Sequence, residues 1–315
     1  MSRVVHKYMP EEMPEEERLA TFAARHETLE RLTCILREQR QAETLNNILL
    51  TGGRGAGKTT LVLMLAHRIE SDDELRRAWL PVRFPEELPA VTSLRDLMAS
   101  TLSALAERRE PEAGDWLQKA EAELDEAQSL EIAVTGLRQI VRRRQRRLVL
   151  FVENLDAFFA RALNEQEEAH LRRLLMTEPF FMIVGTAVRL FPEIADYSRP
   201  FFNFFQELRL DRLNDEQVEE LLLRRADYHH HDLLRRNLGA SRPSIRAISR
   251  LTGGNPRLVV MLYEVLQERR IGPVVGLLRE LIDELTPLLK DVVESLPAQQ
   301  GKVLDALMRR GGTGS

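Results

Sequence analysis

The chain has 315 residues and a net charge of −4, with 43% hydrophobic and 30% charged residues. This balance is typical of a folded, helix-rich protein of more than one domain, and it excludes a protein that attracts nucleic acid over its whole surface. No apolar run approaches the roughly 20 residues of a membrane-spanning helix and no signal-peptide pattern begins the chain, so we expect a cytoplasmic protein without membrane contact. The single cysteine, Cys34, excludes a disulfide or a cysteine zinc site within one chain, and its amphipathic surroundings predict a buried side chain.

Helices and short apolar strands alternate along the first two thirds of the chain. Residues 1–21 are acidic and contain Pro10 and Pro14, so we expect an arm outside the core. Helices are predicted over about residues 25–40, 58–69, 93–108 and 115–147, the last with a break near residues 128–129. The predicted strands are Asn47–Thr51, Trp79–Phe84, Leu148–Val152, Phe181–Thr186 and Glu207–Leu210. Pro81 favours an edge position for the second strand, and the alternation predicts a parallel sheet with helices on both faces.

After about residue 211 the strand pattern ends and amphipathic helices follow, among them residues 215–228, 244–251 and 256–267. We therefore expect an α/β domain over residues 22–211 and an all-helical domain over residues 212–285. Residues 286–315 predict terminal helices, which are either the start of a truncated winged-helix domain or a plain terminal helix.

The segment Gly52–Thr60 reads Gly-Gly-Arg-Gly-Ala-Gly-Lys-Thr-Thr and matches the phosphate-loop pattern G-x-x-x-x-G-K-[ST] between a predicted strand and a predicted helix. Its glycines allow backbone N–H groups to point at phosphate oxygens, and the positive end of the following helix faces the same anion. Lys58 would bring charge to the β- and γ-phosphates, and the Thr59 hydroxyl would bind Mg²⁺. The predicted ATP contacts of this loop are Gly52, Gly53, Gly55, Ala56, Gly57, Lys58, Thr59 and Thr60.

A phosphate loop needs an acidic residue for Mg²⁺ at the carboxyl end of a neighbouring strand. The predicted strand Leu148–Val152 runs directly into Glu153, Asn154 and Asp156. With these two motifs the chain resembles the AAA+ ATPases and the related STAND signal-transduction ATPases. The resemblance places Glu153 at the metal-positioning site, Asn154 where AAA+ enzymes carry the water-activating glutamate, and Asp156 at the trailing acid.

Two more segments in the α/β domain match the same families. Phe22-Ala-Ala-Arg25 resembles the motif that precedes the first helix and lines the adenine pocket. Thr186 ends a predicted strand where these families carry sensor 1, a polar group that binds the γ-phosphate or the attacking water. The resemblance therefore implies that Phe22 and Arg25 bind the base and that Thr186 acts near the γ-phosphate.

A turn in the helical part of the chain matches as well. Leu251–Leu258 reads Leu-Thr-Gly-Gly-Asn-Pro-Arg-Leu, which predicts a helix start with Asn255 as the N-cap and Pro256 in the first turn. The families bring such a turn against adenine and place an arginine, here Arg257, against the phosphates as sensor 2. The matches span about residues 22–270 and imply an α/β, three-layer P-loop ATPase of the ASCE type, with a five-stranded parallel sheet followed by an all-helical lid. Within the superfamily the sequence is most similar to origin-recognition-type initiators, transposition regulators and STAND regulators.

Asn154 departs from the AAA+ pattern at a position that matters for hydrolysis. An amide cannot accept a proton from water, and losing general-base assistance costs roughly 10²–10⁴-fold in rate. In one interpretation Glu153 or Asp156 serves as the base and hydrolysis is slow. In the other, the protein is an essentially non-catalytic ATP-binding interaction module whose nucleotide is structural. The catalytic residues that the resemblance implies are Lys58, Glu153, Asn154, Asp156, Thr186 and Arg257, with Thr59 and Glu153 as ligands of Mg²⁺.

The leading hypothesis is a regulatory or assembly switch that responds to ATP and ADP, acts on DNA or a partner protein, and forms nucleotide-dependent oligomers. DNA would be contacted by the basic segment 138–147 or by a winged helix, although a solvated helix end also explains that segment. Family arginine fingers come from the region between the fourth and fifth strands, where Arg189 and Arg199 lie. The aromatic stretch 200–205 fits either an interface or the core.

Overall fold

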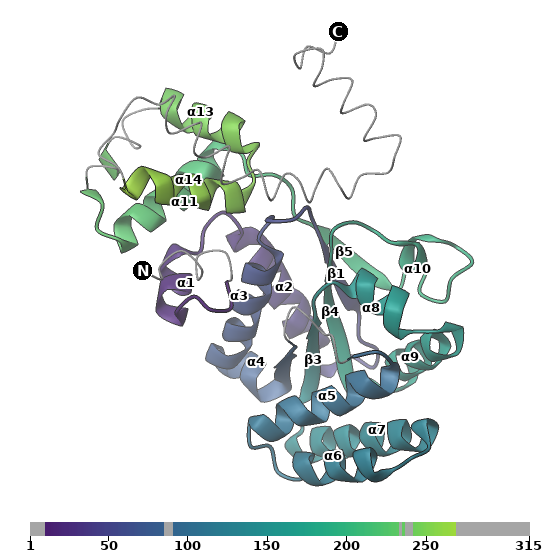
Figure 1. Ribbon diagram of the computed structural model, residues 1–315. Helices are drawn as coiled ribbons and strands as arrows, with labels where there is room; N and C mark the ends of the chain where they lie inside the picture. The colour runs from purple at the N-terminus through teal and green to yellow at the C-terminus, as the bar shows by residue number, and fades with distance from the viewer. Residues whose placement is uncertain (1–9, 85–90, 233–234, 237–241, 269–315) are drawn as a thin grey trace. The chain divides into compact units, whose positions relative to one another are not determined.

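Figure 1 shows the computed structural model of the chain, which describes residues 10–84, 91–232, 235–236 and 242–268. The chain divides into two compact units, with the division after Arg257. The first unit contains the sheet and the described helices up to α13 (Arg242–Thr252), among them α11 (Asp215–Tyr228). The second unit is described only over the part of α14 (Pro256–Glu268) that follows Arg257.

A five-stranded parallel sheet forms the centre of the first unit. The strands are β1 (Asn47–Thr51), β2 (Trp79–Arg83), β3 (Arg147–Val152), β4 (Phe181–Ala187) and β5 (Phe205–Arg209). Their order across the sheet is β2-β3-β4-β1-β5, and every neighbouring pair is parallel. The predicted five-stranded parallel sheet is thus confirmed, and β2, which contains Pro81, lies at an edge.

Helices cover both faces of the sheet and complete a three-layer fold. They are α2 (His26–Glu38), the short 3-10 helix η2 (Gln39–Gln41), α3 (Lys58–Ser71), α4 (Asp73–Ala78), α5 (Leu94–Glu107), α6 (Ala113–Ala122), α7 (Glu126–Arg144), α8 (Leu155–Ala162), α9 (Glu165–Thr177) and α10 (Pro192–Ala195). Successive side chains of β1 alternate between two hydrophobic clusters. Ile48 and Leu50 pack with residues of α2, α3 and α4, whereas Leu49 packs with residues of α5 to α9. Figure 1 shows these two helix layers around the strands.

The long helix predicted over residues 115–147 is interrupted earlier than expected. The break lies between α6 and α7, at residues 123–125, rather than near residues 128–129. Asp125 is the physical reason, because its carboxylate accepts a hydrogen bond from the Gln128 N–H (2.8 Å) and caps the first turn of α7.

The N-terminal segment contains a helix that we did not predict. α1 (Glu15–Thr21) follows Pro14 and carries three glutamates in its first turn, where the helix dipole favours negative charge. It contacts helix α11, and Leu19 packs against the core, so this part of residues 1–21 is not a free arm. Residues 1–9 lie outside the described part of the chain.

The prediction of a buried Cys34 is wrong. Leu29, Leu32 and Leu36 lie on the buried face of α2, and Cys34 falls on the exposed side of the same helix. A helix turns by about 100° per residue, which places Cys34 away from its apolar neighbours.

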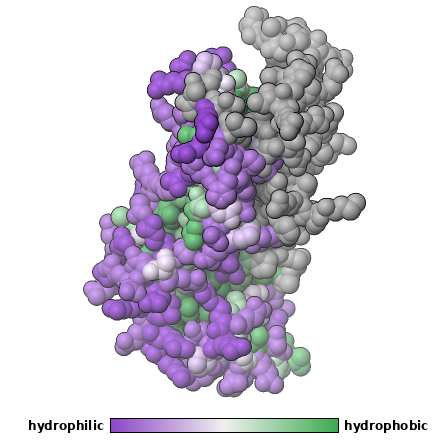
Figure 2. Space-filling model, turned by 90° about the vertical axis from the view of Figure 1, so that its left-hand side faces the viewer, coloured by the Kyte–Doolittle hydropathy of each residue, from purple (hydrophilic) through white to green (hydrophobic). Residues whose placement is uncertain are grey.

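Among the residues that the structure describes, three helices after the sheet lie at the predicted places. α11 (Asp215–Tyr228) and α13 (Arg242–Thr252) contact each other in the first unit. α14 (Pro256–Glu268) begins in the first unit, whose last two residues are Pro256 and Arg257. The predicted helices beyond residue 268, including residues 286–315, lie outside the described residues. Among the residues that the structure describes, no helix is long and apolar enough to span a bilayer. The face in Figure 2 is mainly hydrophilic, with small scattered hydrophobic areas.

Candidate nucleotide site

The phosphate loop connects β1 to α3, as predicted. Gly55 (φ 74°) and Gly57 (φ 91°) adopt left-handed backbone conformations that other residues rarely accept, and α3 begins at Lys58. The Lys58 ammonium folds back over the loop and donates to the carbonyls of Gly52 (2.6 Å) and Gly53 (3.3 Å). The charge of Lys58 therefore lies at the concave backbone that the motif predicts to hold phosphates.

Glu153 and Thr59 meet beside this loop. Glu153 follows the last residue of β3 and is only 7% exposed, and Thr59 is the second residue of α3. The Thr59 hydroxyl donates a hydrogen bond to Glu153 Oε2 at 2.5 Å. A hydroxyl and a carboxylate are hard oxygen ligands, and Mg²⁺ is usually held by one or two protein oxygens together with substrate phosphates. The pair therefore fits a Mg²⁺ ion bound with nucleotide.

The residues around Asn154 form a compact backbone junction. Asn154 has a left-handed conformation (φ 51°, ψ 49°) and is the N-cap residue of α8. Its N–H donates to Thr186 Oγ1 (3.2 Å), and Thr186 is 1% exposed at the end of β4. A Cβ at Gly185 would lie 2.5 Å from Leu155, so this glycine allows α8 to approach β4 closely. The structure thus brings Thr186 and Asn154 together.

Asp156 lies in the first turn of α8 and is partly exposed. Glu153 and Asp156 are the two carboxylates after β3, and Thr59 donates its hydrogen bond to Glu153. The structure therefore separates the two acids that the sequence offers as a base. Glu153 is buried and bonded at the predicted metal position, whereas Asp156 is open to solvent.

Arg25 reaches the phosphate loop, while Phe22 packs in the core. Arg25 Nη2 donates to the carbonyl of Asp211 (2.5 Å) and more weakly to that of Ala56 (3.4 Å). Burial lowers the pKa of the Arg25 guanidinium, and Asp211 opposes this shift. Phe22 is 5% exposed, and its ring meets the His26 ring edge-on at 5.0 Å. The base-binding role of both residues stays a prediction.

The turn before α14 contacts the phosphate loop directly. Asn255 Nδ2 donates to the Arg54 carbonyl (3.0 Å), and the Arg257 N–H donates to the Gly55 carbonyl (3.2 Å). The Asn255 side chain also accepts from the Arg257 N–H (3.0 Å), which confirms the predicted N-cap. A Cβ at Gly55 would lie 2.7 Å from both Asn255 and Arg257, so the glycine permits this approach.

A second contact fixes the same turn from the other side. The Leu213 N–H donates to the Gly254 carbonyl (2.8 Å), and a Cβ at Gly254 would lie 2.2 Å from the Leu213 oxygen. Leu213 and Arg54 were not among the predicted site residues. Both act through the backbone, and no side-chain pattern in the sequence indicates such a role.

The loop, the turn and Arg189 share one cavity of about 500 Å³. Its walls come from the phosphate loop, residues 188–190 after β4, the end of β5 and Pro256. This volume falls within the range of about 300–1,000 Å³ that is typical of small-molecule sites. Arg189 is exposed there.

The other candidate finger, Arg199, is engaged within its own chain. Its Nη2 lies 2.6 Å from Glu168 Oε1, and the Glu168 side chain is 1% exposed. Burial raises the pKa of Glu168, and Arg199 opposes that shift. Nearby Phe201 is fully buried and packs edge-on against Phe159, which supports the core interpretation of the aromatic stretch.

Intramolecular ion pairs occupy much of the basic segment 138–147. Arg138 binds both oxygens of Glu178 (2.5 and 2.6 Å), Arg144 binds Glu110 (2.7 Å), and Arg143 pairs with Glu112. These pairs neutralise charge that a DNA backbone would otherwise meet. They favour the helix-end explanation of the segment.

Comparisons with known proteins agree with this arrangement. Residues 21–184, just over half of the chain, match the family described as AAA ATPase domain. A comparison with curated proteins found no match. The Walker-type ATPase PABY2304 of Pyrococcus abyssi is similar in structure, with a TM-score of 0.62, 15% identity, and coverage of 91% of this chain and 79% of that chain.

Two origin-recognition proteins of Aeropyrum pernix are similar as well. ORC1, solved in complex with DNA, has a TM-score of 0.55 and 18% identity, and the match covers 98% of this chain and 76% of that chain. ORC2, solved as ADPNP and ADP complexes, has a TM-score of 0.56 and 14% identity, with coverage of 84% and 68%. At these identities the likeness shows the fold. Together with the family match, it shows that the chain belongs to the AAA ATPase domain family and has the P-loop ATPase fold of origin-recognition-type proteins.

Proposed function

We propose that the chain is a nucleotide-dependent switch that binds ATP with Mg²⁺ and hydrolyses it slowly. The observation that carries this proposal is the pair of hydrogen bonds from Asn255 and Arg257 to the carbonyls of Arg54 and Gly55. The backbone that would cradle the phosphates also holds the turn before α14. A ligand that changes this loop changes the contact with the turn, so ATP and ADP would favour different arrangements.

The proposed ligand contacts follow from the positions of the side chains. The loop N–H groups and the Lys58 ammonium would bind the phosphates, and Arg257 would approach them from the turn. Thr59 and Glu153 would hold Mg²⁺, which when bound neutralises phosphate charge. Phe22, Arg25 and Pro256 would lie towards the base.

Hydrolysis would be slow because Asp156 would have to serve as the base in place of the glutamate that AAA+ enzymes carry where this chain has Asn154. Asn154 cannot accept a proton, and Glu153 is committed to Thr59 through a 2.5 Å hydrogen bond. Asp156 is then the carboxylate with access to water, so we assign it as the weak base. Thr186 would act as a positioning residue, because it fixes the Asn154 backbone between β3 and β4.

We further propose that the α/β domain spans residues 22–211, that a helical lid spans residues 212–285, and that residues 286–315 are a separate terminal part. The partner would be DNA or another protein, and ATP would promote self-association. The similarity to ORC1, which was solved with DNA, supports DNA as one candidate. Within the basic segment, Arg138, Arg143 and Arg144 are held in ion pairs, which makes these three arginines weaker candidates for a DNA contact.

The test combines single-turnover ATP hydrolysis, with and without duplex DNA, and light scattering in ADP and in ADPNP. We expect slow hydrolysis and a larger particle in ADPNP than in ADP. Equal particle sizes in the two nucleotides, together with no hydrolysis, would refute the switch. DNA-stimulated hydrolysis would identify DNA as the partner.

A matched pair of N-cap variants tests the link between loop and turn. Asn255→Ala removes the bond to Arg54, whereas Asn164→Ala removes the cap of α9, which binds Gln166 and Glu167 N–H groups. Each loses a cap worth about 1 kcal/mol, but only the first touches the phosphate loop. We expect Asn255→Ala to weaken ATP binding several-fold and reduce the ADPNP-dependent size change, and Asn164→Ala to leave both unchanged. Equal effects of the two substitutions would contradict the link.

A non-catalytic ATP-binding module is the second candidate. The left-handed backbone of Asn154 favours it, because asparagine tolerates this conformation better than glutamate does. Position 154 then has a structural reason to lack the base. Tight ATP binding without turnover would support this candidate.

A further inference from the structure

A second cavity, of about 720 Å³, lies at the amino ends of strands β2 and β3. Its walls include the starts of β2 and β3, at Ala78 and Arg147, whereas the phosphate loop follows the carboxyl end of β1. Because all strands are parallel, their amino ends lie on one side of the sheet and their carboxyl ends on the opposite side. The two cavities are therefore distinct sites of the first unit.

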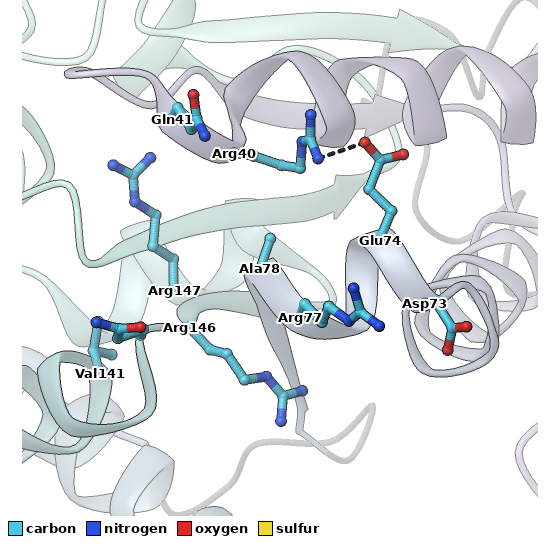
Figure 3. Close-up of a pocket in the computed structure, with 10 residues that line it drawn as sticks. Arg40, Gln41, Asp73, Glu74, Arg77, Ala78, Val141, Arg146 and Arg147 are labelled. Carbon is cyan, nitrogen blue, oxygen red and sulfur yellow. Dashed lines mark ion pairs between the residues drawn. The ribbon is translucent and has the colours of Figure 1, made fainter.

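Four arginines and two carboxylates line this cavity. Figure 3 shows Arg40, Arg77, Arg146 and Arg147 around the small side chain of Ala78, from η2, α4 and the start of β3. The carboxylates are already paired, Glu74 with Arg40 and with Arg37 (3.4 Å), and Asp73 with Arg76 (2.5 Å). Arg37 and Arg76 do not line the cavity, so part of the compensating charge comes from outside it.

Three of the lining arginines have no carboxylate within ion-pair distance in the described part of the chain. Among the described residues, no ion pair joins Arg77, Arg146 or Arg147 to a carboxylate. Arg146 instead donates through Nε (3.2 Å) and Nη2 (2.7 Å) to the Trp79 carbonyl. Arg147 donates through Nη1 to the Gln39 carbonyl (2.9 Å). These neutral acceptors fix both guanidinium groups without neutralising them.

Three further arginines lie close enough to Arg146 to act on its charge. Burial lowers the pKa of Arg146. Among the charges, Glu110 has the largest effect and raises this pKa, whereas Arg108, Arg144 and Arg76 each lower it. Burial also lowers the pKa of Arg147. An anion in the cavity would relieve this unfavourable clustering of like charge.

We propose that this cavity binds the diphosphate group of a small molecule. A guanidinium carries five N–H donors, and the bonds above use two from Arg146 and one from Arg147, which leaves donors for phosphate oxygens. Arginine forks bind phosphate in bidentate geometry, and groups already held in place lose little side-chain entropy on binding. The volume fits a ligand of nucleotide size or smaller.

The test uses the full chain with Mg²⁺ and saturating ADPNP, which is intended to fill the phosphate loop. Calorimetric titration with inorganic pyrophosphate is then compared for the unmodified chain, Arg77→Glu and Arg142→Glu. Arg77 and Arg142 are both exposed, and Arg142 lies outside the cavity. We expect Arg77→Glu to weaken pyrophosphate binding about tenfold or more and Arg142→Glu to leave it unchanged.

The outcomes separate a local site from general attraction. Equal weakening by both substitutions, or no pyrophosphate binding by the unmodified chain, would overturn the proposal. Binding of duplex DNA that depends on Arg77 and is not displaced by pyrophosphate would overturn it in favour of a nucleic-acid surface. If ADP titrated onto the Lys58→Ala variant binds more tightly than pyrophosphate, with the same dependence on Arg77, the source of the diphosphate is a nucleotide. Equal affinity identifies the diphosphate group alone. Since Arg77 is remote from the phosphate loop, failure of ATP binding would not affect this comparison.

Discussion

Gly254 should be the most sensitive glycine of the turn that joins the helical part to the phosphate loop. Gly253 and Gly254 are adjacent and both left-handed, with φ of 55° and 65°. A Cβ at Gly254 would lie 2.2 Å from the Leu213 oxygen and 3.0 Å from its nitrogen, whereas no described atom lies within 4 Å of a Cβ at Gly253. Alanine at the two positions therefore separates backbone strain from close contact.

The expected magnitudes follow from these distances. Gly253→Ala incurs only the left-handed strain, partly offset by a less flexible unfolded chain, which amounts to about 1 kcal/mol. Gly254→Ala incurs the same strain and must also break the Leu213 to Gly254 hydrogen bond, for a total of about 2–3 kcal/mol. The difference of about 1–2 kcal/mol corresponds to a ratio of roughly 5–30 in a local opening equilibrium.

Amide hydrogen exchange in α11 and α13 measures this opening, because exchange reports local unfolding separately from global unfolding. We expect exchange in these helices to be roughly 5–30 times faster in Gly254→Ala than in Gly253→Ala, with α5 unchanged as the core control. ATP binding should weaken in the same order, since the displaced turn carries Asn255 and Arg257. Equal exchange in the two variants would refute the close approach of Gly254 to Leu213.

Substitutions at two further positions test the hydrolysis site and a pH-dependent cap. Asn154→Glu should raise hydrolysis, by up to about 10²–10⁴-fold, if the site lacks only a base, while Asn154→Gly keeps the left-handed backbone and should leave the rate unchanged. An unchanged rate in Asn154→Glu would instead favour the non-catalytic module. Asp72 caps α4 by accepting from Leu75 N–H and also pairs with Arg37 (2.7 Å), and these bonds lower its pKa. Asp72→Ala should therefore cost about 1–2 kcal/mol in the free energy of unfolding at pH 7. Because the folded-state pKa is depressed, this difference should shrink as pH falls below about 4 in urea titrations, and a constant difference down to pH 3 would contradict the cause.

The sheet could be predicted because β1, β3 and β4 are short apolar runs that are buried almost throughout, with local signals at their ends. β1 has the predicted bounds, and Pro81 indicates the edge position of β2. Helices were less well predicted where a polar cap was overlooked: the break before α7 was misplaced, and α8 and α9 were not predicted at all. Asn164 and Glu167 form a capping box that begins α9, and this signal was present in the sequence in the same way as that of Asp125.

The candidate site was predictable where its chemistry is local. The phosphate loop is one run of consecutive residues with a fixed spacing, and Glu153 directly follows the apolar run of β3. The bonds of Asn255 to Arg54 and of Leu213 to Gly254 join positions far apart in the chain, and several of their atoms belong to the backbone. Backbone groups are the same in every residue type, so composition and periodicity carry no information about such pairs.

The backbone geometry at Asn154 bears on how long the ATP-bound state of such a switch would last. A glutamate at this left-handed position would cost about 1–2 kcal/mol relative to a residue that accepts the conformation, so a general base would come at the expense of the junction between β3, α8 and Thr186. The link between loop and turn has no such dependence, because Arg54 and Gly55 offer their carbonyls whichever residue follows Glu153. ATP binding and ATP hydrolysis would therefore be separable on the proposed function. On the proposed function, the ATP-bound arrangement would last long enough for a partner to bind, and its lifetime would be set by the weak base at Asp156 rather than by nucleotide affinity.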